Sequence, residues 1–176
     1  MLQVTSFPAQ KEHYNLKFEW LEGNTIISTM NIVIIKYNAG NIRSVDFALR
    51  RMRVEAEVTD DHAKIRKADK VIFPGVGAAG STMEYLAHRG LDQLLKDLEQ
   101  PVLGICLGQQ LMCDWSEEGD TKCIGIFGQP VLKFPPKDKV PHMGWNRVEP
   151  DEGCRYLRPG FAYFANSFRI VDVPAP

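Results

Sequence analysis

Three nearly continuous apolar segments constrain the fold of this chain more than any other feature. They lie at residues 31–36, 70–73 and 101–105 and are rich in Val, Ile and Leu. A strand with apolar side chains on both faces has to be buried on both faces, which is typical of the centre of a parallel sheet. We therefore predict that these segments are inner strands of a parallel sheet.

Segments with helical spacing of apolar residues separate these strands, and an apolar–acidic alternation at 54–58 indicates a half-buried or edge strand. Alternating strands and helices give a parallel sheet with helices on both faces, because the crossovers are right-handed. The predicted helices lie at 45–52, from a cap at Asp60-Asp61 to Arg66, at 80–88, at 91–98 and at 107–115.

The pattern changes after residue 123, where short apolar stretches are broken by Pro and Gly and show no helical spacing. These stretches predict mixed or antiparallel strands at 124–127, 131–134, 146–149 and 161–165. The predicted fold class is therefore α/β, a three-layer open and mostly parallel sheet with helices on both faces, with mixed or antiparallel strands after residue 123.

Composition excludes several classes of function. The 176 residues carry 21 Lys+Arg against 22 Asp+Glu, a net charge of -1, so neither nucleic acid nor an anionic membrane is expected as the main partner. No apolar run approaches the roughly 20 residues of a membrane-spanning helix. The first residues lack the pattern of a signal peptide, so we expect a cytoplasmic protein with four reduced cysteines. No Cys-x-x-Cys pair is present, and we predict no metal site and no cofactor.

Residues 1–29 differ from the rest because they hold a turn signal and an aromatic patch but no sustained periodicity. Two interpretations remain open: a family-specific addition, or an extension upstream of an ancestral start at Met30. We therefore divide the chain into an N-terminal extension, 1–29, and a single domain, 30–176.

The segment Gly104-Ile-Cys106-Leu-Gly108 follows a buried strand and precedes a helix, which is the context of a nucleophile elbow. The backbone passes close to itself at such a turn, so the positions flanking the nucleophile need glycine. A turn at the C-terminal edge of a parallel sheet directs its side chain to where such sheets bind ligands, and the helix N-terminus favours a thiolate. A buried structural cysteine in a glycine-rich turn is the alternative.

A second glycine-rich turn, Pro74-Gly-Val-Gly77, ends the strand at 70–73. Glycines there leave backbone N–H groups free to face a developing oxyanion, although a plain turn before a helix has the same pattern. Phosphate binding is disfavoured because no Gly-Lys-Ser/Thr follows.

Together the two turns resemble those of the class I, or triad, glutamine amidotransferases. Further strings resemble the glutaminase subunits of imidazole glycerol phosphate synthases within that family, and Pro-His-Met-Gly-Trp-Asn is the most specific of them. The strings are Tyr37-Asn-Ala-Gly-Asn41 with Ser44, Ser116-Glu-Glu-Gly119, Val140-Pro-His-Met-Gly-Trp-Asn146 and Tyr163-Phe-Ala-Asn-Ser167.

The resemblance implies that Cys106 attacks the side-chain amide of glutamine and forms a thioester with release of ammonia. It implies an oxyanion hole from Leu107 and from Gly75 or Val76. Residues implied to bind the substrate are Gly77, Gln110, Asn166, Ser167 and Phe168. The implied partner is a cyclase subunit with a (β/α)₈ barrel, bound as a heterodimer and receiving the ammonia. Residues implied at that interface are Met143, Gly144, Trp145 and Asn146.

The resemblance fails at the base of the triad. In the family a histidine followed two residues later by glutamate takes the proton of the cysteine. None of the four histidines here has Glu at that spacing, and the close family more often has His where Asn166 stands. We therefore expect a domain that lacks its C-terminal end and an inactive 176-residue form. The alternatives are a non-catalytic subunit that binds the cyclase, an amidotransferase subunit for another acceptor, and a cysteine hydrolase of related fold.

Overall fold

The computed structural model describes residues 30–37, 41–154 and 157–171. The predicted extension at 1–29 lies outside the described residues, as do positions 38–40 of the string at 37–41 and the last five positions of the chain. The division of the chain at residue 30 therefore stays a prediction.

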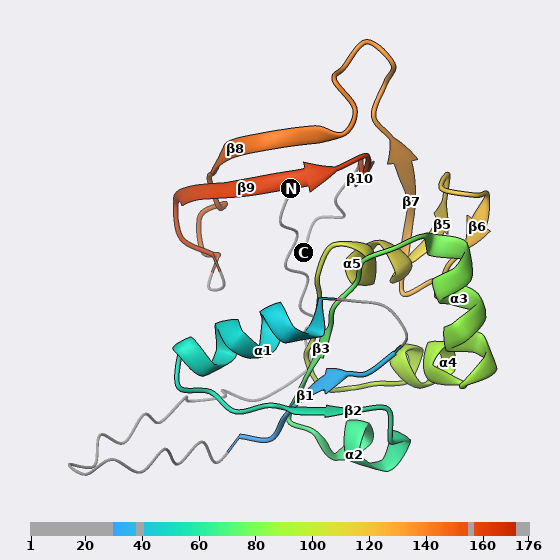
Figure 1. The fold of residues 1–176 in the computed structure, drawn as a ribbon, viewed down its shortest axis with the longest axis vertical. Helices are drawn as coiled ribbons and strands as arrows, with labels where there is room; N and C mark the ends of the chain where they lie inside the picture. The colour runs from blue at the N-terminus through green and yellow to red at the C-terminus, as the bar shows by residue number, and fades with distance from the viewer. Residues whose placement is uncertain (1–29, 38–40, 155–156, 172–176) are drawn as a thin grey trace.

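Four parallel strands form the predicted sheet, in the order β2-β1-β3-β4 (Figure 1). Their bounds are β1 Ile32–Ile35, β2 Glu57–Thr59, β3 Lys70–Phe73 and β4 Val102–Gly104. β1, β3 and β4 lie within the three apolar segments of the sequence, and β2 lies at an edge. The sequence predictions of buried strands and of an edge strand are confirmed, although the edge strand covers 57–59 instead of 54–58.

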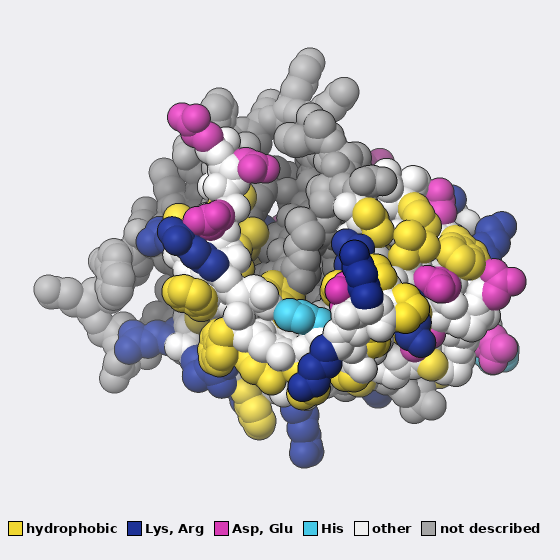
Figure 2. Space-filling model, turned by 90° about the horizontal axis from the view of Figure 1, so that it is seen from above, with side chains coloured by type: hydrophobic (Ala, Val, Ile, Leu, Met, Phe, Trp, Pro, Cys, Tyr) yellow, Lys and Arg dark blue, Asp and Glu magenta, His cyan; other side chains and the backbone are white. Residues whose placement is uncertain are grey.

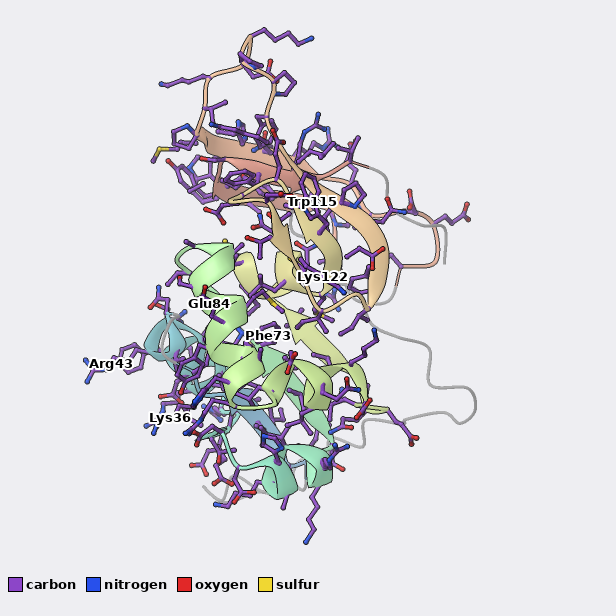
Figure 3. The ribbon with its side chains drawn as sticks, turned by 90° about the vertical axis from the view of Figure 1, so that its right-hand side faces the viewer. Lys36, Arg43, Phe73, Glu84, Trp115 and Lys122 are labelled. Carbon is purple, nitrogen blue, oxygen red and sulfur yellow. The ribbon has the colours of Figure 1, made fainter. Side chains whose placement is uncertain are left out.

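Helices cover both faces of this sheet, so the predicted three layers are confirmed. On one face, Ile34 and Ile72 pack with Leu49 of α1. On the other face, Val33 and Phe73 belong to a larger core formed with α2, α3, α4 and α5. Figure 3 shows Phe73 inside the molecule. The helices are α1 Ile42–Arg51, α2 His62–Lys67, α3 Ala79–His88, α4 Leu91–Lys96 and α5 Leu107–Leu111.

The chain after α5 forms two further sheets, which confirms the prediction of mixed and antiparallel strands. One has the order β10-β7-β5-β6, with β5 and β7 parallel and the other pairs antiparallel. The other is the antiparallel β8–β9 hairpin, which crosses the top of the molecule in Figure 1. Their bounds are β5 Cys113–Ser116, β6 Thr121–Lys122, β7 Phe127–Lys133, β8 His142–Val148, β9 Gly160–Asn166 and β10 Phe168–Ile170.

Two predicted elements are wrong near the junction of these sheets. The helix predicted at 107–115 ends at Leu111, and β5 begins at Cys113 because it pairs with β7 and β6. The strand predicted at 124–127 is mostly a loop. Its backbone N–H groups at Ile124 and Gly125 donate to the carbonyls of Leu111 (2.9 Å) and Cys113 (2.8 Å) at the end of α5 and the start of β5.

The predicted cap of α2 is confirmed. The Asp61 carboxylate accepts hydrogen bonds from the backbone N–H groups of Ala63 (2.8 Å) and Lys64 (3.0 Å), which are among the orphan donors of a helix start. Across the described residues, no helix is long and apolar enough to cross a membrane.

Candidate active site

Cys106 occupies the turn between β4 and α5, as the sequence predicted. It is the N-cap residue of α5, with φ 54° and ψ -119°, and it is exposed. A non-glycine residue with positive φ costs of the order of 1–3 kcal/mol, so the surrounding structure has to hold it there. The geometry keeps this residue at the surface on a strained turn, which excludes the alternative of a buried structural cysteine.

Gly104 and Gly108 make this turn possible. A Cβ added at Gly104 would lie 2.7 Å from the Cα of Gln109, and one added at Gly108 would lie 2.0 Å from the carbonyl oxygen of Phe73. Both distances are far below van der Waals contact, and both involve backbone atoms, which cannot rotate away. The predicted need for glycine on both sides of Cys106 is confirmed.

The Pro74–Gly77 turn lies directly against the start of α5. A Cβ at Gly75 would be 2.2 Å from the backbone nitrogen of Gly108 and 2.8 Å from the Cβ of Leu107. The N–H of Ile105 donates to the carbonyl of Phe73 at 3.0 Å, which fixes the two strand ends side by side. The structure therefore brings the two glycine-rich turns together, although residues 74 and 106 are far apart in the sequence.

The predicted oxyanion donors lie in these two turns. Leu107 is the first residue of α5, so its N–H is one of the groups without an acceptor inside the helix. On the facing turn Val76 is exposed and Gly77 has φ 109°, a conformation that favours glycine. The arrangement can place two backbone N–H groups near one exposed thiol, and the roles of these residues remain predictions.

Glu118 anchors the far end of the second turn. Its carboxylate accepts a hydrogen bond at 3.0 Å from the backbone N–H of Ala79, the first residue of α3. A negative charge at a helix N-terminus is favourable. Sequence analysis noted the string Ser116-Glu-Glu-Gly119 but did not predict this contact, because nothing local relates Glu118 to a helix start 39 residues earlier.

Tyr37 contacts the near end of the same turn. Its hydroxyl donates to the carbonyl of Pro74, and its ring packs against that of Phe73 with centroids 5.5 Å apart. Burial raises the pKa of Tyr37 well above its usual range, and the nearby Cys106 raises it further. The sequence offered no signal for this role beyond an aromatic residue at a strand end.

Most of the predicted substrate-binding residues lie together. The Nε2 of Gln110 and the Nδ2 of Asn166 both donate to the carbonyl of Phe168, at 3.3 Å and 2.9 Å. The carbonyl of Ser167 accepts from the N–H of Phe134 at 3.0 Å. The structure thus joins α5, which begins just after Cys106, to the turn between β9 and β10, while Gly77 lies on the facing turn.

None of the described histidines is followed two residues later by Glu, and two of them make other contacts. His62 contacts the carbonyl of Arg89 at 3.0 Å, and His142 contacts the Nδ2 of Asn146 at 2.8 Å. Within the described ranges, no three His, Cys, Asp or Glu side chains group in a way that could hold a metal ion.

The predicted interface residues divide between the two faces of β8. Met143 and Trp145 are 59% and 70% exposed, whereas Gly144 and Asn146 are half-buried on the opposite face. Across the hairpin Trp145 pairs with Tyr163, and their rings meet edge to face at 5.6 Å. Phe161 lies beside them and is also exposed. Figure 2, which looks onto this end of the molecule, shows apolar side chains gathered with basic ones.

We define the hairpin face as the exposed side of β8 and β9, and sequence analysis found only part of it. The exposed aromatic residues of β9 follow the strand period of two, a signal present in the stretch predicted at 161–165. Its larger side chains are those of Met143, Trp145, Arg147, Phe161 and Tyr163.

Comparison with known proteins agrees with the fold. The family "Glutamine amidotransferase class-I" matches residues 33–171. A crystal structure of a glutamine amidotransferase covers 81% of this chain with a TM-score of 0.65; at 15% identity it shows the likeness of fold alone.

Curated relatives are much more similar in sequence. Imidazole glycerol phosphate synthase subunit HisH of Bacteroides fragilis is 53% identical over 147 residues, which cover 80% of this chain and 75% of that protein. The subunits of the same name from Bacteroides thetaiotaomicron and Idiomarina loihiensis are 53% and 40% identical over 147 residues, covering 80% and 81% of this chain and 75% and 74% of those proteins.

An exposed cysteine on a strand-to-helix turn of an α/β sheet is typical of enzymes that use a cysteine as nucleophile, and the matched proteins belong to such a class. The chain belongs to the class I glutamine amidotransferase family, among the HisH subunits of imidazole glycerol phosphate synthase.

Proposed function

We propose that this chain is the glutaminase subunit of an imidazole glycerol phosphate synthase and works in the cytoplasm. It binds glutamine, releases ammonia and passes that ammonia to a cyclase subunit in histidine biosynthesis. The observation that carries the proposal is the exposed Cys106 on its strained turn, packed beside the Gly75 turn. The identity of 53% to a HisH subunit supports the choice of substrate and pathway.

In the proposed reaction the Sγ of Cys106 attacks the side-chain carbonyl carbon of glutamine. The carbonyl oxygen becomes an oxyanion, which accepts hydrogen bonds from the N–H of Leu107 and from one N–H of the Gly75–Val76 segment. The C–N bond then breaks, and the nitrogen takes a proton and leaves as ammonia. Water attacks the resulting thioester, so that glutamate and the free thiol are formed.

We propose that Gly77, Gln110 and the segment Asn166–Phe168 hold the amino-acid end of glutamine. Gln110 and Asn166 already share the Phe168 carbonyl, so substrate groups would meet a surface whose side chains are fixed. Fixed polar groups are useful here because they lose little freedom when the substrate binds.

The proposed reaction also needs proton transfer. The thiol has to lose a proton and the leaving nitrogen has to gain one, and the sequence has no His-x-Glu pair to do this. A general acid–base group contributes about 10²–10⁴ in rate, so a polypeptide of these 176 residues assayed by itself is expected to turn over slowly.

The proposed partner is a cyclase with a (β/α)₈ barrel, bound as a heterodimer. Met143 and Trp145 lie on the hairpin face and can contact the partner directly, while Gly144 and Asn146 support that face from behind. Direct transfer matters because ammonia in neutral water is mostly protonated and then is no nucleophile.

Release of glutamate from glutamine tests the proposal, with the cyclase and its nucleotide ligand present. We expect slow turnover that imidazole added to the buffer increases, since imidazole can serve as the missing base. Cys106→Ala should abolish it, and Cys154→Ala, a change at the other exposed cysteine, should leave it intact. Turnover that survives in Cys106→Ala would contradict the proposal.

A non-catalytic subunit that binds the cyclase is the second candidate, because the sequence has no His-x-Glu pair. It predicts binding to the barrel protein but no release of glutamate even with imidazole. Copurification with a different acceptor enzyme would instead favour an amidotransferase subunit for another substrate.

A further inference from the structure

We propose that Tyr37 is a positioning residue that fixes the oxyanion turn through the peptide group between Pro74 and Gly75. The inference rests on the proposed function, since it concerns the turn that would hold the oxyanion. Its basis is a contact that joins the end of β1 to the end of β3 just beside Cys106.

The contact acts on one defined peptide group. The Tyr37 hydroxyl donates to the Pro74 carbonyl, and the same peptide carries the N–H of Gly75. In a planar trans peptide the C=O and the N–H point in opposite directions, so fixing the carbonyl also fixes the N–H. A hydrogen bond to the carbonyl further polarises the amide and strengthens its N–H as a donor.

The tyrosine itself has little freedom to move. Only 5% of Tyr37 is exposed, and its ring packs against Phe73, which is fully buried. A phenol held in this way donates from a fixed point, so the bond acts as a rigid support.

Further contacts along the turn restrict its backbone conformation. The Cα of Gly75 lies against the backbone of Leu107 and Gly108, and the N–H of Ala79 is held by Glu118 at 3.0 Å. Tyr37 therefore supplies the first of three supports along residues 74–79. Without it, the peptide before Gly75 could rotate, and an error of this kind near reacting atoms is costly in rate.

Two reagents separate this role from a general role in folding. A chloromethyl ketone analogue of glutamine places its carbonyl where the substrate carbonyl lies, and attack by the thiolate develops an oxyanion. Iodoacetamide reacts by direct displacement of iodide and develops none. The rate with the ketone divided by the rate with iodoacetamide, both measured at Cys106, therefore reports the contribution of the oxyanion hole.

Mass spectrometry can follow both reactions at each cysteine of the full chain at mildly alkaline pH. Cys154 is exposed and serves as the internal reference, whereas burial raises the pKa of Cys113 to about 12 and that of Cys123 to about 11 and keeps both unreactive. Protection of Cys106 by glutamine would show that the ketone occupies the substrate site.

We expect Tyr37→Phe to lower the ratio at Cys106 about tenfold, less than the loss of a whole oxyanion donor, and to leave Cys154 unchanged. The matched control is Tyr85→Phe, which removes a hydroxyl from α3. An unchanged ratio in Tyr37→Phe, equal slowing with both reagents, or the same fall in Tyr85→Phe would overturn the inference.

Should Tyr37→Phe fail to fold, 3-fluorotyrosine at position 37 keeps the ring and supplies a more acidic donor. A ratio at or above that of the unmodified chain then supports the inference, and a lower ratio overturns it. Failure of the proposed function has a different signature: the unmodified chain itself would show no preference for the ketone and no protection by glutamine.

Discussion

The central parallel sheet and the β8–β9 hairpin both carry large apolar side chains, but they place them differently. Phe73 in β3 is completely buried, whereas Phe161 in β9 is 72% exposed. Full burial of such a side chain stabilises a fold by about 1.5–3 kcal/mol, so the sheet side chains hold the protein together. The hairpin face contributes little of this kind.

The difference separates the two tasks of a subunit. The rigid sheet holds Cys106 and the Gly75 turn, where small displacements would be costly. The hairpin offers Trp145, Tyr163 and Phe161 on one exposed face, and aromatic residues in such a group are typical of interaction sites. The same apolar chemistry therefore serves stability in the sheet, and we propose that it serves association in the hairpin.

The largest effect is expected from adding a methyl group where the sheet is tightest. Gly108→Ala would place a Cβ 2.0 Å from the Phe73 carbonyl oxygen, so we expect a loss of about 4 kcal/mol or more in the free energy of unfolding, or no folding at all. Urea denaturation followed by circular dichroism measures it. Gly144→Ala in the hairpin is the control, because its Cβ would meet nothing within 4 Å, and its change should stay within about 0.5 kcal/mol. Equal free energies of unfolding for the two variants would contradict the difference between the sheet and the hairpin.

A matched pair of phenylalanines tests the contrast next. Phe73→Ala empties a fully buried site and should lower the free energy of unfolding by about 3–5 kcal/mol. Phe161→Ala removes an exposed ring and should cost less than about 1 kcal/mol. Thermal unfolding of both variants gives the comparison, and a hairpin variant as unstable as the sheet variant would show that the hairpin belongs to the core.

For binding of the cyclase, unlike for stability, we expect the hairpin face to matter most. Trp145→Ala is expected to weaken the complex with the cyclase by about 2 kcal/mol, some thirtyfold in Kd, with little change in the stability of the free chain. Calorimetry measures both quantities. Val58→Ala removes an exposed apolar side chain from β2, at the other end of the molecule in Figure 1, and should leave Kd unchanged. Similar affinities for wild type and Trp145→Ala would remove the hairpin face from the proposed interface.

The smallest effect concerns surface charge beside the sheet. The hydrogen bond from Arg89 is the main cause that lowers the pKa of Asp60 below its ordinary value. A carboxyl with a lowered pKa stabilises the fold above its unfolded pKa, near 4, and this contribution is lost as the pH falls through the folded value. Unfolding midpoints between pH 6 and about pH 2 should therefore fall less steeply in Asp60→Asn than in wild type. Arg89→Gln, which removes the charged partner of Asp60, should flatten the profile in the same way, and a steeper fall in Asp60→Asn would contradict the assignment.

The inner strands could be predicted because a few adjacent apolar residues are enough to identify a buried strand. The apolar character of 31–36 required burial on both faces, and the Asp61 cap was visible from its position before a short helix. The prediction of a helix as far as residue 115 was wrong. The spacing of Leu111, Met112 and Trp115 is compatible with a continuous helix, and it is equally compatible with a helix end followed by a strand. Pairing with β7 decided between them, and β7 begins at residue 127.

The sequence alone determined the alternation of strands and helices, the glycines beside Cys106 and the family of the chain. Only the tertiary structure decided that Tyr37 supports the Pro74 carbonyl and that Glu118 holds the start of α3. The physical reason is the distance along the sequence over which each interaction acts. Strand propensity and turn chemistry act between neighbours in the chain, whereas these contacts join residues 37 and 39 positions apart and exist only once the order of strands has brought them together.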